Sequence, residues 1–231
     1  MLALLHTSPV HVPVFDALRD ETHPGLGLRH FVDEELLRRA RREGPAAVTH
    51  AVGVVLRRAV AEGARAVLCT CSTLGGVAEE AGAAGLAVPV LRVDRPMAAA
   101  AVAAGPRVVL LAALASTLAP TTALIEEEAR RAGRTVTVRP VLVDVAWSRF
   151  EAGDTEGYVR EVATAADRVT HADAIVLAQA SMAPVQHFTT TPIPVLSSPR
   201  PGFEAAARAA RHSPDRPLDI PTQPNRPPAH P

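Results

Sequence analysis

The sequence contains no lysine: the Lys+Arg total of 24, all arginine, faces 24 Asp+Glu. Without a side-chain amine, the chain cannot form a Schiff base with pyridoxal phosphate or with a carbonyl substrate. A phosphate loop that needs its lysine is excluded for the same reason. The formal net charge of +0 argues against a nucleic-acid partner, which usually requires a basic surface.

Cysteine is scarce as well, with only Cys69 and Cys71 in the chain. A pair separated by one residue closes almost no loop and makes a poor structural disulfide. The apolar start, residues 1–5, lacks the basic region of a signal peptide, and no apolar run reaches the roughly 20 residues of a membrane span. The 9 histidines follow no metal-binding spacing. We therefore expect a cytoplasmic protein with reduced thiols, no membrane contact and no metal.

Proline is concentrated in residues 213–231, which cannot hold a helix or a central strand and are expected to form a disordered tail. The rest of the chain supplies ample material for a core, since 48% of the sequence is hydrophobic. A folded body of one large or two small domains is therefore expected before this tail.

The body alternates short β-branched runs with amphipathic stretches rich in Ala, Arg and Glu, a pattern typical of βαβ units with parallel strands. The expected strands are 2–5, 28–32, 66–69, 88–93, 107–112, 136–143, 174–177 and 193–196. The expected helices are 33–42, 46–62, 77–84, 120–131, 155–170 and 203–211. Asp33 and Asp154 stand at helix starts as caps, Pro120 suits a first helical turn, and Gly133 suits a helix stop. The sequence therefore predicts an α/β fold.

Two segments recur about half a chain apart. Residues 66–73 (AVLCTCST) match 175–182 (IVLAQASM), which sets Ala180 opposite Cys71, and 88–96 (VPVLRVDRP) match 193–201 (IPVLSSPRP). Two matches in the same order indicate a duplication into two pseudo-symmetric lobes, 1–104 and 105–212, each a parallel sheet flanked by helices. Because such sheets bind ligands beyond the carboxyl ends of their strands, the active-site cleft is expected between the lobes.

Four short motifs carry a resemblance to a known family: residues 4–7 (LLHT), 71–73 (CST), 94–98 (DRPMA) and 110–117 (LLAALAST). In order and spacing, they resemble the aspartate/glutamate/hydantoin racemase superfamily. The resemblance implies a small-molecule pocket between two lobes and no cofactor. It also implies proton transfer at a substrate α-carbon by two cysteines, one from each lobe. Related members isomerise maleate or decarboxylate arylmalonates, the latter with a single cysteine.

The resemblance implies that Cys71 is the catalytic thiol. Exposed N–H groups and the dipole of the helix after Gly75-Gly76 are expected to lower its pKa. The second-lobe position is Ala180, which cannot exchange a proton, so a symmetric two-thiol racemase is not expected. The residues implied to bind the substrate or to orient the thiol are His6, Thr7, Ser72, Thr73, Ser116, Thr117, Gln179 and Ser181. Burial of Cys71 as a small hydrophobe, and capping of turns by the hydroxyls, remain the alternative interpretations.

The sequence thus predicts a cofactor-independent racemase or isomerase that acts on a small, amino-acid-like carboxylate through a single thiol. A decarboxylase of the same superfamily stays open, and so does a carboxylate-binding or regulatory protein without turnover. A serine hydrolase is disfavoured because no G-x-S-x-G elbow occurs. Apolar helix faces are plentiful and relatives are commonly dimers, so a homodimer is expected.

Overall fold

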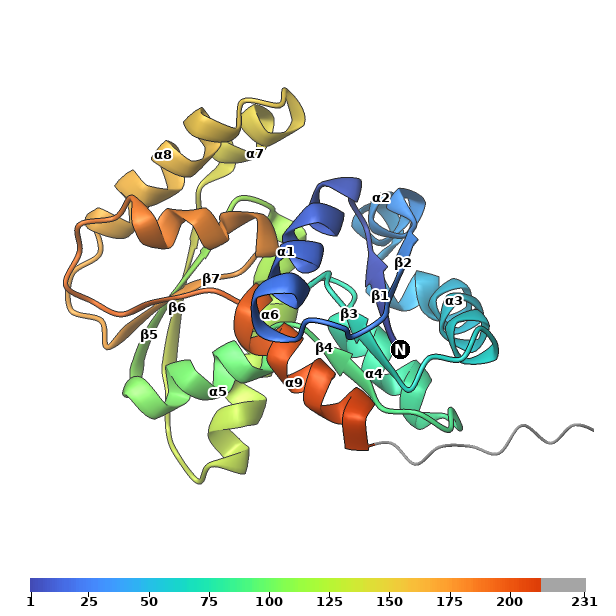
Figure 1. The fold of residues 1–231 in the computed structure, drawn as a ribbon. Coiled ribbons are helices and arrows are strands. Elements are labelled where there is room, and N and C mark those ends of the chain that lie inside the picture. Colours follow the sequence, from blue (N-terminus) through green and yellow to red (C-terminus); the bar gives the residue numbers. More distant parts are fainter. Residues whose placement is uncertain (213–231) are drawn as a thin grey trace, which may run out of the picture.

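The computed structural model describes residues 1–212, and the tail 213–231, for which disorder is expected, lies outside them. The described residues form two lobes, each built on a four-stranded sheet (Figure 1). The strands are β1 (Leu2–His6), β2 (Leu28–Val32), β3 (Ala66–Cys69), β4 (Val90–Arg92), β5 (Arg107–Ala112), β6 (Thr137–Leu142), β7 (Ala174–Leu177) and β8 (Val195–Leu196). Both sheets are parallel, in the orders β2-β1-β3-β4 and β6-β5-β7-β8. This shared order confirms the two-lobed α/β fold.

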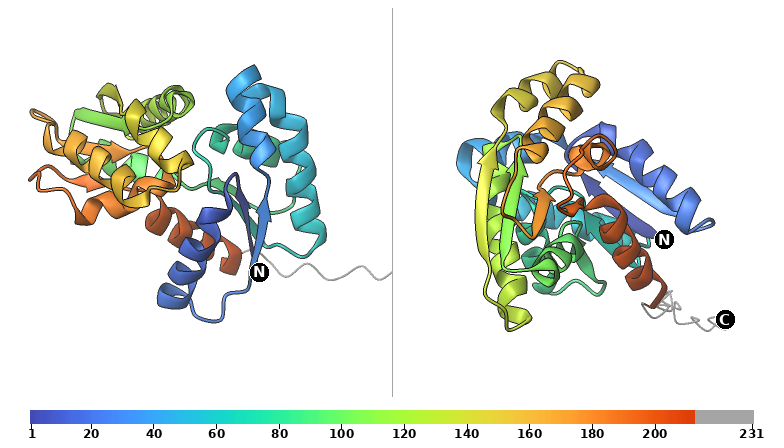
Figure 2. Two further views of the ribbon diagram at one scale, coloured as in Figure 1. Left: turned by 90° about the horizontal axis from the view of Figure 1, so that it is seen from above. Right: turned by 90° about the vertical axis from the view of Figure 1, so that its left-hand side faces the viewer.

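Helices flank both sheets (Figure 2). They are α1 (Val12–Thr22), α2 (Glu34–Glu43), α3 (Thr49–Ala61), α4 (Gly75–Ala83), α5 (Arg95–Ala104), α6 (Ala115–Arg131), α7 (Asp144–Glu151), α8 (Thr155–Asp167) and α9 (Pro199–His212), with 3₁₀ turns η1 (Pro9–His11), η2 (Pro45–Val48) and η3 (Ala180–His187). Asp33 caps α2 by accepting from the N–H groups of Glu35 and Leu36, and Asp154 caps α8 through Gly157 N–H. Within residues 1–212, no helix combines the length and the apolar character needed to cross a membrane.

The inner strands β1, β3 and β7 are buried along their whole length, because helices cover both faces of each sheet. This explains why they are continuous apolar runs without polar alternation. The chain leaves the inner strands at the edge where the two lobes face each other, and polar residues begin there. The fold therefore places the polar loop ends of both sheets in one region.

Two helices cross between the two lobes, which were expected at residues 1–104 and 105–212. Helix α5 packs Met97 and Ala101 in one core with Leu110 of β5, on the second sheet. Helix α9 packs Phe203 in one core with Leu4 of β1, on the first sheet. Each helix follows the last strand of one sheet and covers the other, so the lobes exchange their final helices, as Figure 1 shows for α5 and α9.

Helix α6 begins earlier than expected, at Ala115, which places Pro120 inside the helix. Proline has no N–H group, so Pro120 cannot donate to the carbonyl of Ser116, four residues before it. The helix is held nevertheless by Thr121, Leu124 and Ile125, which are buried. The turn that follows the β5 strand is thereby helical from its start, and Ser116 lies within it.

Candidate functional site

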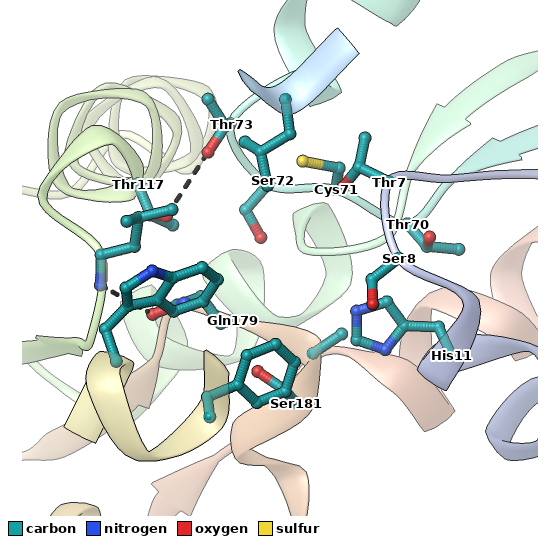
Figure 3. Close-up of a pocket in the computed structure, with 15 residues that line it drawn as sticks. Thr7, Ser8, His11, Thr70, Cys71, Ser72, Thr73, Thr117, Gln179 and Ser181 are labelled. Carbon is teal, nitrogen blue, oxygen red and sulfur yellow. Dashed lines mark hydrogen bonds between the residues drawn. The ribbon is translucent and has the colours of Figure 1, made fainter. Parts of the chain in front are cut away.

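A pocket lies between the lobes at the carboxyl ends of the central strands (Figure 3). Its cavity volume is about 50 Å³. It brings together most of the residues implied by the sequence: Thr7, Cys71, Ser72, Thr73, Thr117, Gln179 and Ser181. His6 and Ser116 do not line it. The pocket is therefore built by loops from both lobes, as the duplication predicted.

The lining of the pocket is polar but uncharged. It consists of hydroxyls, a thiol, an imidazole, an amide and apolar side chains, and no Arg, Asp or Glu of residues 1–212 contributes to it. Three or more His, Cys, Asp or Glu side chains that could hold a metal ion are not found together anywhere in these residues. An anion bound in the pocket would thus depend on neutral hydrogen-bond donors.

Cys71 lies two residues beyond the end of β3, in the loop that leads into α4, and is half-buried. The Thr7 side chain and the N–H groups of Thr73 and Leu74 are hydrogen-bond partners of its sulfur. These donors favour the thiolate, as expected for a loop before a helix. The other thiol, Cys69, is fully buried, and burial raises its pKa.

The expected fall in the pKa of Cys71 is wrong, because burial outweighs the donors. Removal of the sulfur from water penalises the charged form and raises the pKa of this thiol above its usual range. The hydrogen bonds from Thr7, Thr73 and Leu74 lower it, but by less. Cys71 is therefore a protonated thiol at neutral pH, equipped to donate a proton.

The hydroxyls around Cys71 have different partners. Ser72 Oγ donates to the carbonyl of Ala178 in the second lobe, at 2.7 Å, so its proton is committed to holding the lobes together. Thr73 Oγ1 lies 3.4 Å from Thr117 Oγ1, which joins the two lobes across the pocket wall. Ser116 Oγ is buried without a hydrogen-bond partner in the described part of the chain. Thr73 and Thr117 are thus the hydroxyls best placed to reach a ligand.

The sheet registers show that Gln179, and not Ala180, is the second-lobe counterpart of Cys71. Leu5 pairs with Cys69 in the first sheet, and Leu111 pairs with Leu177 in the second. The residue after each strand donates back to the central strand: Thr70 N–H to Leu5 O and Ala178 N–H to Leu111 O. Counting two residues on from Cys69 and Leu177 gives Cys71 and Gln179.

The Gln179 side chain repeats the contacts of Cys71 in the second lobe. Its Oε1 accepts from the N–H groups of Ala113, at 2.7 Å, and Leu114, at 3.3 Å, in the loop after β5. In the first lobe, the loop after β1 supplies the Thr7 contact to Cys71. Two N–H donors fix the amide orientation, so the Nε2 group is the free end of this side chain. Gln179 offers a donor but no titratable group.

His6 is fully buried behind the pocket and belongs to a hydrogen-bonded chain. Its Nδ1 lies 2.8 Å from Thr70 Oγ1 and its Nε2 lies 2.8 Å from His30 Nδ1. His30 Nε2 lies 3.4 Å from Asp16 Oδ1. Burial, with the nearby His30 and His11, lowers the pKa of His6 to about 3. His6 is therefore neutral at neutral pH and holds Thr70, the residue before Cys71.

This depressed pKa predicts a loss of stability on mild acidification. An unfolded histidine titrates near 6.5, whereas folded His6 titrates at about 3, so the unfolded state binds the extra proton between these values. The stabilising contribution is complete above the unfolded pKa and decreases as the pH falls. From pH 7 to pH 5, His6 alone should lower the free energy of unfolding by about 2 kcal/mol. Urea denaturation at both pH values measures it.

A His6→Gln variant, which carries no titrating ring, should show a smaller drop between the two pH values. His50→Gln is the matched control, because His50 is exposed on α3. Equal drops in the wild type and His6→Gln would contradict the prediction.

Several pocket residues were not identified from the sequence. Trp147 and Phe150 of α7 form one wall, and their rings stack with centroids 5.1 Å apart. His11 of η1 points into the pocket (Figure 3). Only its place just beyond the β1 strand, at the edge where ligands bind, could have indicated His11. Ser181 is held by Tyr158, whose hydroxyl lies 2.8 Å from the Ser181 Oγ.

Comparison with solved structures supports the fold. A glutamate racemase from Campylobacter jejuni subsp. jejuni is 14% identical, with a TM-score of 0.70 over 90% of this chain and 85% of that one. A glutamate racemase isoform from Bacillus anthracis is 14% identical, with a TM-score of 0.68 over 92% and 82%. A glycine-to-cysteine mutant of arylmalonate decarboxylase is 22% identical, with a TM-score of 0.62 over 94% and 96%.

No curated protein matches the chain. The family model described as Asp/Glu/Hydantoin racemase matches residues 15–206, which include most of both lobes and the pocket-lining residues other than Thr7, Ser8 and His11. This match extends over far more than half of the sequence and agrees with the strand order and the inter-lobe pocket. The chain belongs to the Asp/Glu/hydantoin racemase family.

Proposed function

We propose that this protein is a cofactor-independent enzyme of the racemase or isomerase type that moves a proton at the α-carbon of a small carboxylate. The observation that carries the proposal is the place of Cys71, a half-buried thiol in an uncharged pocket between the lobes. Family membership and the racemases among the structural neighbours support it.

The pocket supplies donors for a substrate carboxylate. The hydroxyls of Thr73 and Thr117 and the free Nε2 group of Gln179 surround the space in front of the Cys71 sulfur (Figure 3). Loss of the α-proton moves charge onto the carboxylate as an enediolate. Preorganised donors in a water-poor site stabilise this charge more than they stabilise the ground state. Cys71, protonated because of its burial, donates a proton to the carbanion.

A larger groove adjoins the pocket and gives room for the rest of the substrate. It has a cavity volume of about 500 Å³ and shares Phe150, Ala180 and Ser181 with the pocket. Its walls include the apolar side chains of Val14 and Leu18. We propose that the substrate places its acid group by Cys71 and an apolar substituent in this groove.

A decarboxylase is the second candidate, and the protonation state of Cys71 favours it. Loss of carbon dioxide leaves a carbanion that needs one proton and no base, so a single protonated thiol suffices. The arylmalonate decarboxylase among the neighbours is a relative with this reaction in its name. The two candidates differ in whether an α-hydrogen or a carboxylate is lost.

The deciding experiment offers aspartate, glutamate, hydantoins, maleate and arylmalonates to the full-length protein in deuterated water. Racemase activity incorporates deuterium at the α-carbon and erodes optical purity, whereas decarboxylation releases carbon dioxide and leaves one deuterium in the product. Heat-denatured protein is the control. Saturable binding by calorimetry with no exchange, isomerisation or carbon dioxide release would contradict an enzyme and indicate a carboxylate-binding protein.

A further inference from the structure

We propose that His11 is the second proton-transfer group of this pocket and works with Cys71 in place of a second thiol. The inference rests on the proposed function, because it assigns a partner to the same reaction. Cys71 and His11 are the titratable side chains among the described residues that line the pocket.

The second lobe offers no competing acid or base. Gln179, the counterpart of Cys71, is an amide whose Oε1 is held by two N–H groups. Ala180 carries only a methyl group. Ser181 shares its hydroxyl with Tyr158, and burial raises the pKa of Tyr158 to about 12, so neither gives up a proton at neutral pH. Proton transfer from the side of the pocket away from Cys71 must therefore come from the first lobe.

The fold of the first lobe positions His11 at the pocket. His11 is the last residue of η1, which follows β1 after two residues and directly precedes α1, so its backbone is fixed by elements of the first lobe. Both its ring and the Cys71 sulfur line the pocket, with Cys71 at the top and His11 at the lower right of the view in Figure 3. His11 lines both the pocket and the adjoining groove, and Ala180 and Ser181 do the same. The imidazole thus lies at the junction of the pocket and the groove, next to the place where we expect the substrate α-carbon.

The ring of His11 makes no hydrogen bond to other residues of the described structure. Neither ring nitrogen has a hydrogen-bond partner within residues 1–212, and the side chain does not cap α1. His6, by contrast, is bound at both ring nitrogens. The centroids of the His11 and His6 rings lie 6.4 Å apart. An unbonded imidazole in a polar pocket is available to a substrate.

The protonation states complement each other. Burial lowers the pKa of His11 to about 4, so the ring is a neutral base at pH 7, while burial raises the pKa of Cys71 and leaves a neutral acid. A His11 ring nitrogen takes the α-proton, and the C–H electron pair moves into the carboxylate as an enediolate. The pair then forms a new C–H bond with the proton of the Cys71 S–H group, on the other face. This transfer leaves His11 as imidazolium and Cys71 as thiolate. In that form the Cys71 thiolate takes the α-proton of the other enantiomer and the imidazolium returns a proton to the opposite face. Exchange with water converts both groups back to their neutral forms.

The test uses the full-length protein and whichever chiral substrate of the panel it racemises. His11→Asn should lower racemisation by about 10²- to 10⁴-fold. It should also abolish deuterium wash-in from one enantiomer only, and Cys71→Ala should abolish it from the other. His50→Asn, an exposed histidine on α3, is the matched control and should behave like the wild type. Added imidazole should restore part of the activity of His11→Ala, which a structural role would not allow.

The outcomes separate the two proposals. If His11→Asn retains wild-type exchange from both enantiomers while Cys71→Ala is inactive, the role of His11 is wrong and the proposed function survives. The same conclusion follows if His11→Asn loses deuterium wash-in from both enantiomers equally and added imidazole restores no activity to His11→Ala. If no compound of the panel turns over, or if Cys71→Ala is fully active, the proposed function fails and the role of His11 fails with it.

Discussion

Replacement of Cys71 by alanine is expected to lower kcat by at least about 10³-fold on every substrate that the protein accepts. The substitution removes the proton donor and enlarges the site only by the volume of the sulfur. Because the thiol acts in the transition state and the substrate carboxylate is held by other groups, KM should change much less than kcat. Steady-state kinetics on the purified variant, with circular dichroism to confirm folding, provides the measurement.

Cys69→Ala is the matched control, two residues away in the same chain segment. Cys69 is fully buried at the end of β3, and its S–H group donates to the carbonyl of Cys71, at 3.6 Å. Its loss should leave kcat close to that of the wild type. An active Cys71→Ala variant, or equal losses in both variants, would show that the thiol in the pocket has no special role.

The strands were predictable because helices bury both sides of each sheet, which makes the inner strands continuous apolar runs. The ends of the strands were less predictable. Strand β4 is Val90–Arg92 and strand β8 is Val195–Leu196, and both are shorter than the apolar runs that contain them. Helices α1, α5 and α7 were missed, and both α1 and α5 have a proline near their first residue. Such prolines signal a turn as readily as a helix start.

The exchange of α5 and α9 between the lobes was not predictable from chain order. An apolar helix face indicates that the helix is buried, but it does not indicate which sheet the helix covers. Helix α5 is Ala-rich, with Met97 and Val102 buried, and either sheet would satisfy this pattern. The choice depends on how the two lobes meet, a long-range property of the packed structure.

The first-lobe half of the site followed from the Cys71-Ser72-Thr73 loop, but the second-lobe half was displaced by one residue. Short runs of Ala, Val, Ile and Leu align almost equally well in neighbouring registers, so Ala180 was matched to Cys71. Backbone hydrogen bonds of the sheets resolve the register in favour of Gln179. The conclusion that the second lobe lacks a thiol is unaffected. His11 lies in a single 3₁₀ turn, which has no periodic pattern to reveal it.

Asp94→Ala is expected to cost about 3–5 kcal/mol of folding free energy, because it leaves a buried guanidinium without its counter-charge. Asp94 is fully buried, and Arg92 is 5% exposed. The carboxylate accepts from Arg92 Nε at 2.6 Å and from Nη2 at 2.9 Å, a two-pronged contact. Arg92 Nη2 also donates to the carbonyl of Ser72, at 3.3 Å, so the pair supports the loop that carries Cys71.

Urea denaturation at pH 7 measures this cost, and Glu156→Ala is the matched control. Glu156 pairs with Arg160 on the exposed surface of α8, where solvent screens the pair, so its loss should be barely measurable. The double variant Arg92→Met/Asp94→Leu removes both charges and should recover much of the stability lost in Asp94→Ala. Its activity should stay low, since the Ser72 carbonyl loses its donor and the Cys71 loop its anchor. A cost below about 1 kcal/mol for Asp94→Ala would contradict the assignment, because it would place this pair with the exposed ones.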